Sequence, residues 1–123
     1  DAIDGPQRLQ FVYDLMPELT KMSKRKALLL SGGQQKMVAL GRALIAGEKL
    51  LLLDEPFEGV APALAKRISD VITSLKGDGL SVLIAQSELS HSSDLLQRES
   101  VIERGEIIKV NVIDPAFAQR VPV

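Results

Sequence analysis

A glycine-led helix start, followed one helix later by four leucines and an acidic pair, constrains this chain more than any other feature. Residues 30–56 read LSGGQQKMVALGRALIAGEKLLLLDEP. The run from Leu50 to Leu53 is short and continuously apolar, which is typical of a strand buried on both faces. Asp54 and Glu55 follow it and Pro56 ends it, at the carboxyl edge where open α/β sheets bind ligands. The order of these elements predicts an α/β fold with a ligand site at that edge.

The start of the helix is suited to an anion. Gly32 and Gly33 have no Cβ, so the backbone can approach a ligand closely there. The first N–H groups of a helix lack intrahelical partners and carry partial positive charge, which favours a phosphate. Ser31 can add a hydroxyl contact to that phosphate, or it can serve only as the N-cap. Taken alone, these residues leave both an anion site and a plain helix start open.

The acidic pair is the second chemical device in this stretch. Successive strand side chains point in opposite directions, so Asp54 and Glu55 cannot share one role. Asp54 is suited to hold Mg²⁺, directly or through water. Glu55 is suited to polarise an attacking water. An acidic pair after leucines is equally compatible with a solvated loop, so the pair by itself does not decide between these interpretations.

In combination, the two devices resemble the nucleotide-binding subunits of ABC transporters. LSGGQ at Leu30–Gln34 resembles the signature motif of that family, and LLLLDEP at Leu50–Pro56 resembles its Walker B motif. The resemblance implies Asp54 as the Mg²⁺ ligand and Glu55 as the catalytic residue for ATP held by the same subunit. It also implies that the signature residues bind the γ-phosphate of ATP held by a second subunit; these are Ser31, Gly32, Gly33 and Gln34.

Two later segments extend the resemblance. The loop after Pro56 resembles the D-loop, which implies that Gly59, Val60 and Ala61 lie at a dimer interface, and its form is similar to that of the branched-chain amino-acid importers. A second apolar strand is predicted at Leu80–Ala85, parallel to the first and joined to it by a crossover helix. The family carries a switch residue, commonly His, after this strand. Here that place is occupied by Gln86 and Ser87, so the His is absent.

The resemblance implies a partial P-loop NTPase fold of the ABC type. Its parts are parallel strands with crossover helices, a small helical subdomain and a C-terminal β-hairpin that turns at Arg104-Gly105. We expect residues 1–48 to form the helical subdomain with the signature motif and the following helix. Residues 49–110 would form the C-terminal part of the ATPase core, and residues 111–123 a tail. Within the helical subdomain, Leu9–Met22 is the segment implied to dock on a membrane partner.

Composition argues against several other functions. The net charge of −1 and an aromatic content of 3% provide no basis for binding nucleic acid. The absence of cysteine excludes disulfides and thiolate metal sites. No apolar run approaches the roughly 20 residues that a membrane helix needs, so we expect no direct membrane insertion. The family resemblance instead implies a cytoplasmic, peripheral location on the inner face of the membrane, held there by permease subunits.

The chain contains no G-x-x-x-x-G-K-[ST] segment, whose backbone amides and Lys hold the β- and γ-phosphates in this chemistry. The resemblance therefore covers Leu9 to Val110 but only the second half of a family ATPase domain. We interpret the chain as the C-terminal portion of an ABC importer ATPase subunit, closest to the branched-chain amino-acid class. It would pair with a second ATPase subunit, as a homodimer or heterodimer, and with permease subunits. It would bind ATP and Mg²⁺ only with the missing half and be inactive alone.

Two alternatives stay open at the level of sequence. The first is a non-catalytic or diverged fragment that acts as an interaction module, which the missing P-loop and switch His support. The second is an ABC-type ATPase outside transport, against which the lack of a basic surface argues. The transported solute does not follow from these residues, because other subunits select it in the family.

Overall fold

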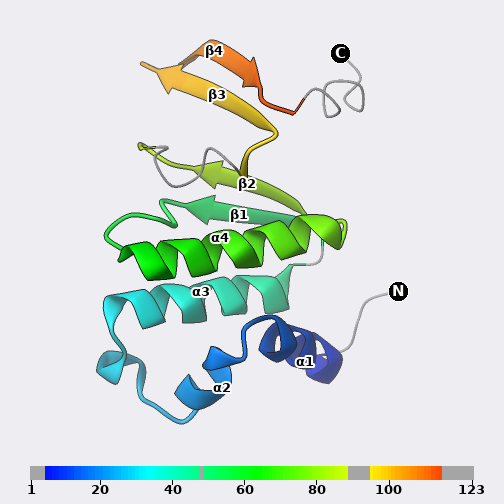
Figure 1. The fold of residues 1–123 in the computed structure, drawn as a ribbon, viewed down its shortest axis with the longest axis vertical. Helices are drawn as coiled ribbons and strands as arrows, with labels where there is room; N and C mark the ends of the chain where they lie inside the picture. Colours follow the sequence, from blue (N-terminus) through cyan, green and yellow to red (C-terminus); the bar gives the residue numbers. More distant parts are fainter. Residues whose placement is uncertain (1–4, 48, 89–94, 115–123) are drawn as a thin grey trace. The chain divides into compact units, whose positions relative to one another are not determined.

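The computed structural model describes residues 5–47, 49–88 and 95–114, and it divides into two compact units, Asp1–His91 and Ser92–Val123. The described elements of the first unit are α1 (Gly5–Leu15), α2 (Glu18–Met22), a 3₁₀ turn η1 (Ala27–Leu29), α3 (Gly32–Ala46), β1 (Leu50–Asp54), α4 (Pro62–Gly77) and β2 (Ser81–Ala85). Those of the second unit are β3 (Arg98–Glu103) and β4 (Glu106–Val112). Figure 1 labels each of these elements except η1.

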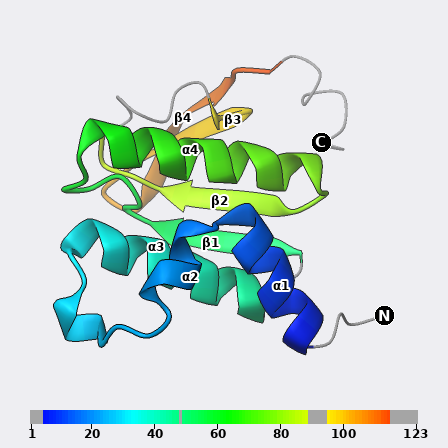
Figure 2. The same cartoon turned by 60° about the horizontal axis from the view of Figure 1, so that its bottom comes forward.

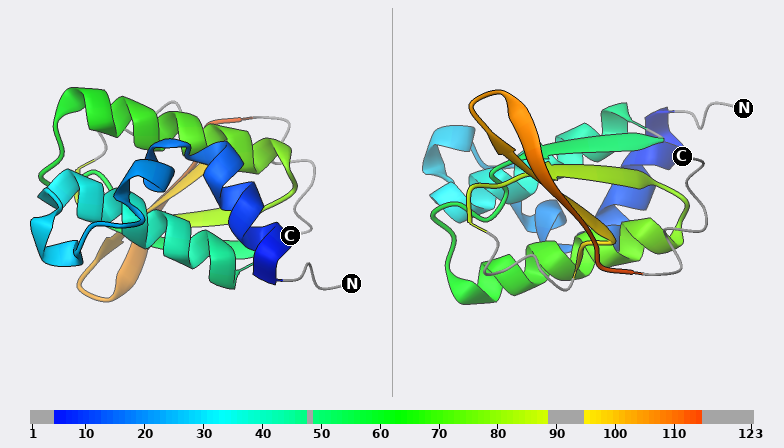
Figure 3. Two further views of the ribbon diagram at one scale, coloured as in Figure 1. Left: turned by 90° about the horizontal axis from the view of Figure 1, so that it is seen from below. Right: turned by 90° about the horizontal axis from the view of Figure 1, so that it is seen from above.

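The first unit is built in layers around a parallel pair of strands. β1 and β2 pair in register from Leu50↔Ser81 to Asp54↔Ala85, and α4 is the crossover between them, as the sequence predicted. α3 and α4 lie side by side on one face of this pair, and α1 and α2 pack against the outside of these helices (Figures 2 and 3). The core lies between these layers, and its largest fully buried side chains are those of Met16, Met37, Leu44, Ile72, Leu75, Val12 and Val71.

The strands are covered on one face only, so the prediction of burial on both faces is wrong. Leu51 is 3% exposed, because it faces the helices. Leu50 and Leu52 are 55% and 64% exposed, and Leu83 on the neighbouring strand is 63% exposed. Side chains alternate across a sheet, so helices on one side bury every second residue and leave the others in water.

The helical segment before the signature stretch breaks at Pro17. Pro17 has no backbone N–H to donate and lies between α1 and α2, at the N-cap of α2. Gly41 allows close packing here, since a Cβ on it would lie 2.7 Å from Leu19 Cδ1. Met37, Leu40 and Leu44 of α3 are buried. Ile45 of the same helix is 40% exposed and lines an open groove together with residues of α1 and α2.

The second unit is an antiparallel hairpin that turns at Arg104-Gly105, which confirms the predicted two-residue turn. Both residues have positive φ, 51° and 82°, as a type I′ turn requires. Residues 111 and 112 belong to β4, so the prediction of a tail from Asn111 is wrong for these two residues. Ladder hydrogen bonds hold them in the strand.

Three further observations complete the fold. The helix predicted around Leu89–Leu96 falls mostly outside the described residues, as does most of the predicted tail. Among the helices that the structure describes, none combines the length and apolar character required to cross a membrane.

Candidate functional site

The N-terminal end of α3 is a fully formed capping box. Ser31 Oγ accepts a hydrogen bond from the Gln34 N–H at 3.1 Å, and Gln34 Oε1 accepts one from the Ser31 N–H at 3.0 Å. This reciprocal pair satisfies two backbone donors and sets the angle at which the chain enters the helix. The side chain of Gln34 is therefore engaged in the turn itself, while Ser31 and Gly32 are exposed.

The N–H groups of Gly32 and Gly33, also at this end, have no hydrogen-bond partner within the described part of the chain. A Cβ on Gly32 would meet nothing within 4 Å, whereas one on Gly33 would lie 2.4 Å from Leu64 Cδ2 of α4. The helix thus presents free donors and partial positive charge to open space, which is the arrangement that binds an anion.

The turn after β1 holds Glu55 in an unusual backbone conformation. Its φ is +48°, a region that non-glycine residues adopt infrequently. The Glu55 N–H donates to the Ala85 carbonyl at 2.8 Å, which extends the β1–β2 ladder by one residue. The Glu58 N–H donates back to the Glu55 carbonyl at 3.2 Å and closes the turn. These contacts offset the cost of the positive φ, which is about 1–3 kcal/mol for a non-glycine residue.

The Glu55 carboxylate is held by the residues that follow β2. Gln86 Nε2 donates to Glu55 Oε2 at 2.6 Å, and the Ser87 N–H donates to Glu55 Oε1 at 3.0 Å. Gln86 is itself oriented, because its Oε1 accepts the Phe57 N–H at 3.4 Å. Hydrogen bonds to a carboxylate are stronger than neutral ones, so this side chain has one preferred orientation. The two residues at the predicted switch position therefore both contact Glu55.

A polar pocket of about 360 Å³ opens beside this carboxylate. It joins the loop after β1 to the end of β2, and its lining residues are Glu55, Phe57, Glu58, Gly59, Val60, Gln86, Ser87 and Glu88. Gly59 adopts φ of +67°, which its lack of a Cβ permits. Ala61, the third residue predicted for the dimer interface, is exposed and serves as the N-cap residue of α4.

Asp54 lies at the exposed carboxyl end of β1, and its carboxylate makes no hydrogen bond to any described residue. Across the described ranges, no group of three or more His, Cys, Asp or Glu side chains could hold a metal alone. Mg²⁺ is commonly held by one or two carboxylates together with substrate phosphates and water. Asp54 is an exposed carboxylate at the end of a strand, so it could supply the carboxylate while phosphates and water supply the other ligands.

Sequence reasoning missed two cations that join distant segments, and of the two it is Lys36 that contacts the turn carrying Glu55. Lys36 of α3 donates from Nζ to the carbonyl oxygens of Glu55 and Glu58, at 3.0 and 2.5 Å. Arg67 of α4 donates to Glu18 Oε1 at 3.0 Å and to the Leu15 carbonyl at 2.9 Å. Both contacts join residues far apart in the chain, and the only local signal was that Lys36 lies off the apolar stripe of α3.

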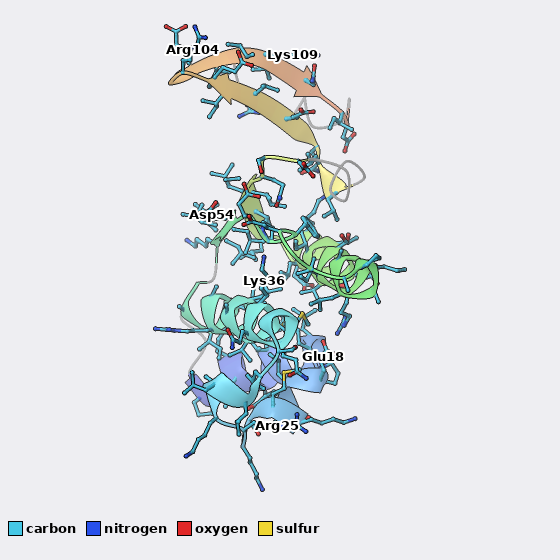
Figure 4. The ribbon with its side chains drawn as sticks, turned by 90° about the vertical axis from the view of Figure 1, so that its left-hand side faces the viewer. Glu18, Arg25, Lys36, Asp54, Arg104 and Lys109 are labelled. Carbon is cyan, nitrogen blue, oxygen red and sulfur yellow. The ribbon has the colours of Figure 1, made fainter. Side chains whose placement is uncertain are left out.

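The signature stretch and the acidic pair lie at the same end of the first unit. Figure 1 shows the start of α3 on the same side as the carboxyl ends of β1 and β2. In Figure 4, Lys36 points from α3 toward the end of β1, where Asp54 lies, and its ammonium donates to the carbonyl of the next residue, Glu55. One end of the first unit thus carries an exposed helix start, the exposed carboxylate of Asp54 and the oriented carboxylate of Glu55. These are groups suited to phosphate chemistry.

Comparison with known proteins agrees with this chemistry. A family model described as ABC transporter matches residues 7–58. The high-affinity branched-chain amino acid transport ATP-binding protein BraG of Pseudomonas aeruginosa is 36% identical over 108 residues, which are 88% of this chain and 46% of BraG. The ADP conformation of MJ1267, an ATP-binding cassette of an ABC transporter, matches with a TM-score of 0.80 and 32% identity over 93% of this chain and 44% of MJ1267. The chain belongs to the ABC transporter ATP-binding cassettes.

This ABC cassette chain spans less than half the length of both proteins, 46% of BraG and 44% of MJ1267. It also resembles a relative that bears another transport name. The lipopolysaccharide export system ATP-binding protein LptB of Escherichia coli is 34% identical over 110 residues, which are 88% of this chain and 46% of LptB. The chain is therefore similar both to a protein named for amino acid transport and to one named for lipopolysaccharide export.

Proposed function

We propose that this chain is the C-terminal portion of an ABC-type ATPase subunit that couples ATP binding and hydrolysis to solute import. The observation that carries the proposal is the Glu55 carboxylate, oriented by Gln86 and Ser87 at the same end of the unit as the open start of α3. The class of solute is proposed to be branched-chain amino acids. The similarity to BraG supports this assignment, as does the loop from Gly59 to Pro62.

The start of α3 would bind the γ-phosphate of ATP held by a second ATPase subunit. The unpaired N–H groups of Gly32 and Gly33 supply the donors, and the exposed Ser31 adds its hydroxyl. Gln34 contributes by closing the capping box that keeps this end rigid. Gly59, Val60 and Ala61 would lie at the interface with that second subunit, where the exposed Gly59 and Ala61 are available for contact.

The acidic pair would act on ATP held by this chain's own subunit. Glu55 would accept a proton from the attacking water, and its two hydrogen bonds fix the direction in which it does so. Asp54 would hold Mg²⁺, which when bound neutralises charge on the phosphate oxygens. Gln86 and Ser87 occupy the switch position, and they would act by orienting Glu55.

ATP and Mg²⁺ would bind only when a P-loop-bearing half is supplied, because no such segment exists in these 123 residues. We propose that this chain alone is inactive. In its assembly it would be peripheral on the cytoplasmic face of the membrane, held there by permease subunits.

The test is a fusion that places the N-terminal half of BraG ahead of this chain. We expect ATP hydrolysis by the fusion and none by the chain alone. The variant Glu55→Gln should lose hydrolysis by about 100-fold or more, because a positioned general base contributes that much. It should still form a dimer that depends on ATP, measured by light scattering.

The matched control is Asp70→Asn, which removes an exposed carboxylate of α4 that, within the described part of the chain, forms a surface ion pair with Lys66. This variant should hydrolyse ATP at the parent rate. Hydrolysis by the 123-residue chain alone, or equal rates in the fusion and its Glu55→Gln variant, would contradict the proposal.

A second candidate is a non-catalytic interaction module, which the missing P-loop favours. The same fusion separates the two, since a diverged module would not hydrolyse ATP even with the P-loop supplied. The solute class has its own test, which is uptake of leucine and valine by Pseudomonas aeruginosa cells in which the fusion replaces BraG. Restored uptake is expected, and hydrolysis without uptake would refute the branched-chain assignment.

A further inference from the structure

Lys36 connects two parts of the site that serve different nucleotides. It lies five residues after Ser31, on the second turn of α3. Its ammonium donates to the carbonyl oxygens of Glu55 at 3.0 Å and Glu58 at 2.5 Å, across 19 and 22 residues of sequence. The same helix that presents the anion-binding donors thus holds the turn that carries Glu55 (Figure 4).

Lys36 brings positive charge to two carbonyl oxygens of the turn after β1. They belong to one tight turn and converge on the same ammonium, so their negative ends would repel each other without it. The Glu55 carbonyl also accepts the Glu58 N–H at 3.2 Å, so it has two donors. The turn contains the positive φ of Glu55, a conformation that persists only when its surroundings determine it.

Glu55 is consequently held from two sides. Lys36 fixes its carbonyl from α3, while Gln86 and Ser87 fix its carboxylate from the end of β2. If α3 moved relative to the strands, Lys36 would shift the backbone carbonyl of Glu55, while Gln86 and Ser87 would keep holding its carboxylate. The orientation of the carboxylate would therefore change. Lys36 contacts no carboxylate in the described part of the chain, so its charge is used on this turn and not in an ion pair.

We propose that Lys36 is a positioning residue that couples two nucleotide sites. When the start of α3 binds one ATP, Lys36 would transmit the resulting shift of α3 to the turn of Glu55, whose carboxylate acts on the other ATP. The inference rests on the proposed function, because it assumes that the two ends serve two ATP molecules in a dimer. It assigns to Lys36 a coupling between the two hydrolytic sites, separate from phosphate binding itself.

The experiment uses the BraG fusion, and it compares Lys36→Met, Lys36→Arg and the control Lys66→Met. Methionine keeps the length and apolar stem of lysine and removes only the donors, whereas arginine restores donors to the turn. Lys66 is 77% exposed, and its ion pair in the described ranges is with Asp70, so its replacement tests loss of a surface cation. Each variant is measured for kcat, KM for ATP, the Hill coefficient and melting temperature.

We expect Lys36→Met to lower kcat by about 10- to 100-fold, because small misplacement of a reacting group has that effect. KM for ATP should change by less than about threefold, and the Hill coefficient should fall toward 1, since the sites no longer communicate. Lys36→Arg should recover most of kcat and the Hill coefficient. Lys66→Met should match the parent in all four measurements.

A purely structural role would lower the melting temperature without changing the Hill coefficient, and that result would overturn the inference. If Lys36→Met does not fold, Lys36→Gln provides a shorter donor and should give an intermediate kcat and Hill coefficient. Parent values of kcat and the Hill coefficient for either variant would likewise overturn the role of Lys36. The proposed function would still stand in that case, provided that Glu55→Gln remained inactive. A fusion that hydrolyses no ATP would refute the proposed function itself.

Discussion

Both ends of α3 leave backbone polar groups without intrahelical partners, and the chain treats the two ends differently. At its N-terminal end, the capping box satisfies two donors, and the N–H groups of the exposed Gly32 and the half-buried Gly33 have no hydrogen-bond partner among the described residues. At its C-terminal end, the guanidinium of Arg8 donates from Nε to the Leu44 carbonyl at 2.8 Å, and it also donates to the Gly47 carbonyl. Arg8 is 8% exposed and lies over the ring of Phe11.

The difference shows how to separate a structural helix end from a functional one. Every helix leaves unpaired groups and partial charge at both ends. The chain neutralises the negative end with its own buried cation, which joins α1 to α3. It leaves the positive end without such a partner among the described residues, and there we propose that a phosphate binds. The predictions that follow are ordered from the largest expected effect to the smallest.

The strongest test places a negative charge at the open end. In the fusion, Gly32→Asp should weaken ATP-dependent dimer formation and hydrolysis by about 100-fold or more, because facing like charges cost several kcal/mol. The same change should raise the free energy of unfolding by about 0.3–1 kcal/mol, since an acid suits a helix N-terminus. The added Cβ meets nothing within 4 Å, so no clash obscures the result.

The two effects of that variant have opposite signs, and urea unfolding measures one while ATPase assays measure the other. Gly32→Ala is the control, which adds the Cβ without the charge and should retain hydrolysis within a few fold. If stability and hydrolysis fell together in Gly32→Asp, the open end would be structural and the comparison would fail.

The second prediction concerns the closed end. Arg8→Met should lower the free energy of unfolding by about 1–3 kcal/mol, because it leaves two acceptors at the end of α3 without their donor. Chemical denaturation followed by circular dichroism would measure it. Arg42→Met, an exposed change on the same helix, should alter stability by less than about 0.5 kcal/mol. Equal losses from the two arginines would mean that Arg8 does not close the helix.

The smallest predicted effect separates capping from ligand binding at Ser31. Ser31→Ala removes the acceptor of the Gln34 N–H and should cost about 0.5–2 kcal/mol of stability. Ser31→Asp keeps a capping acceptor and should unfold at nearly the parent denaturant concentration. Its added charge should nevertheless weaken ATP-dependent dimer formation in the fusion, and parent-like dimer formation would place Ser31 outside the phosphate site.

Much of this architecture could be predicted from local patterns in the sequence. Pro17 separates α1 from α2, Arg104-Gly105 forms the hairpin turn, and the apolar runs at Leu50–Leu53 and Leu80–Ala85 became a parallel pair. These features depend on backbone chemistry or short-range periodicity, which a sequence displays directly.

The unpredicted features depend on packing between distant segments. Arg8 reaches the Leu44 carbonyl across 36 residues and Lys36 reaches the Glu55 carbonyl across 19, and a carbonyl acceptor carries no side-chain signature. The exposure of Leu52 could not be predicted either, because an apolar run in the sequence does not show whether one face of the strand or both are covered by other elements. The placement of Gln86 and Ser87 against Glu55 needed the parallel register that only the folded chain supplies.

The outward-facing leucines of β1 and β2 affect how this polypeptide behaves in water. Leu50, Leu52 and Leu83 each keep more than half of their surface wetted. Removing each from water would contribute about 1–2 kcal/mol, so self-association becomes favourable as concentration rises. Self-association therefore limits the concentration at which the chain stays dissolved as a monomer. Mild detergent or a polar replacement of Leu52 should raise that concentration while the secondary structure stays the same.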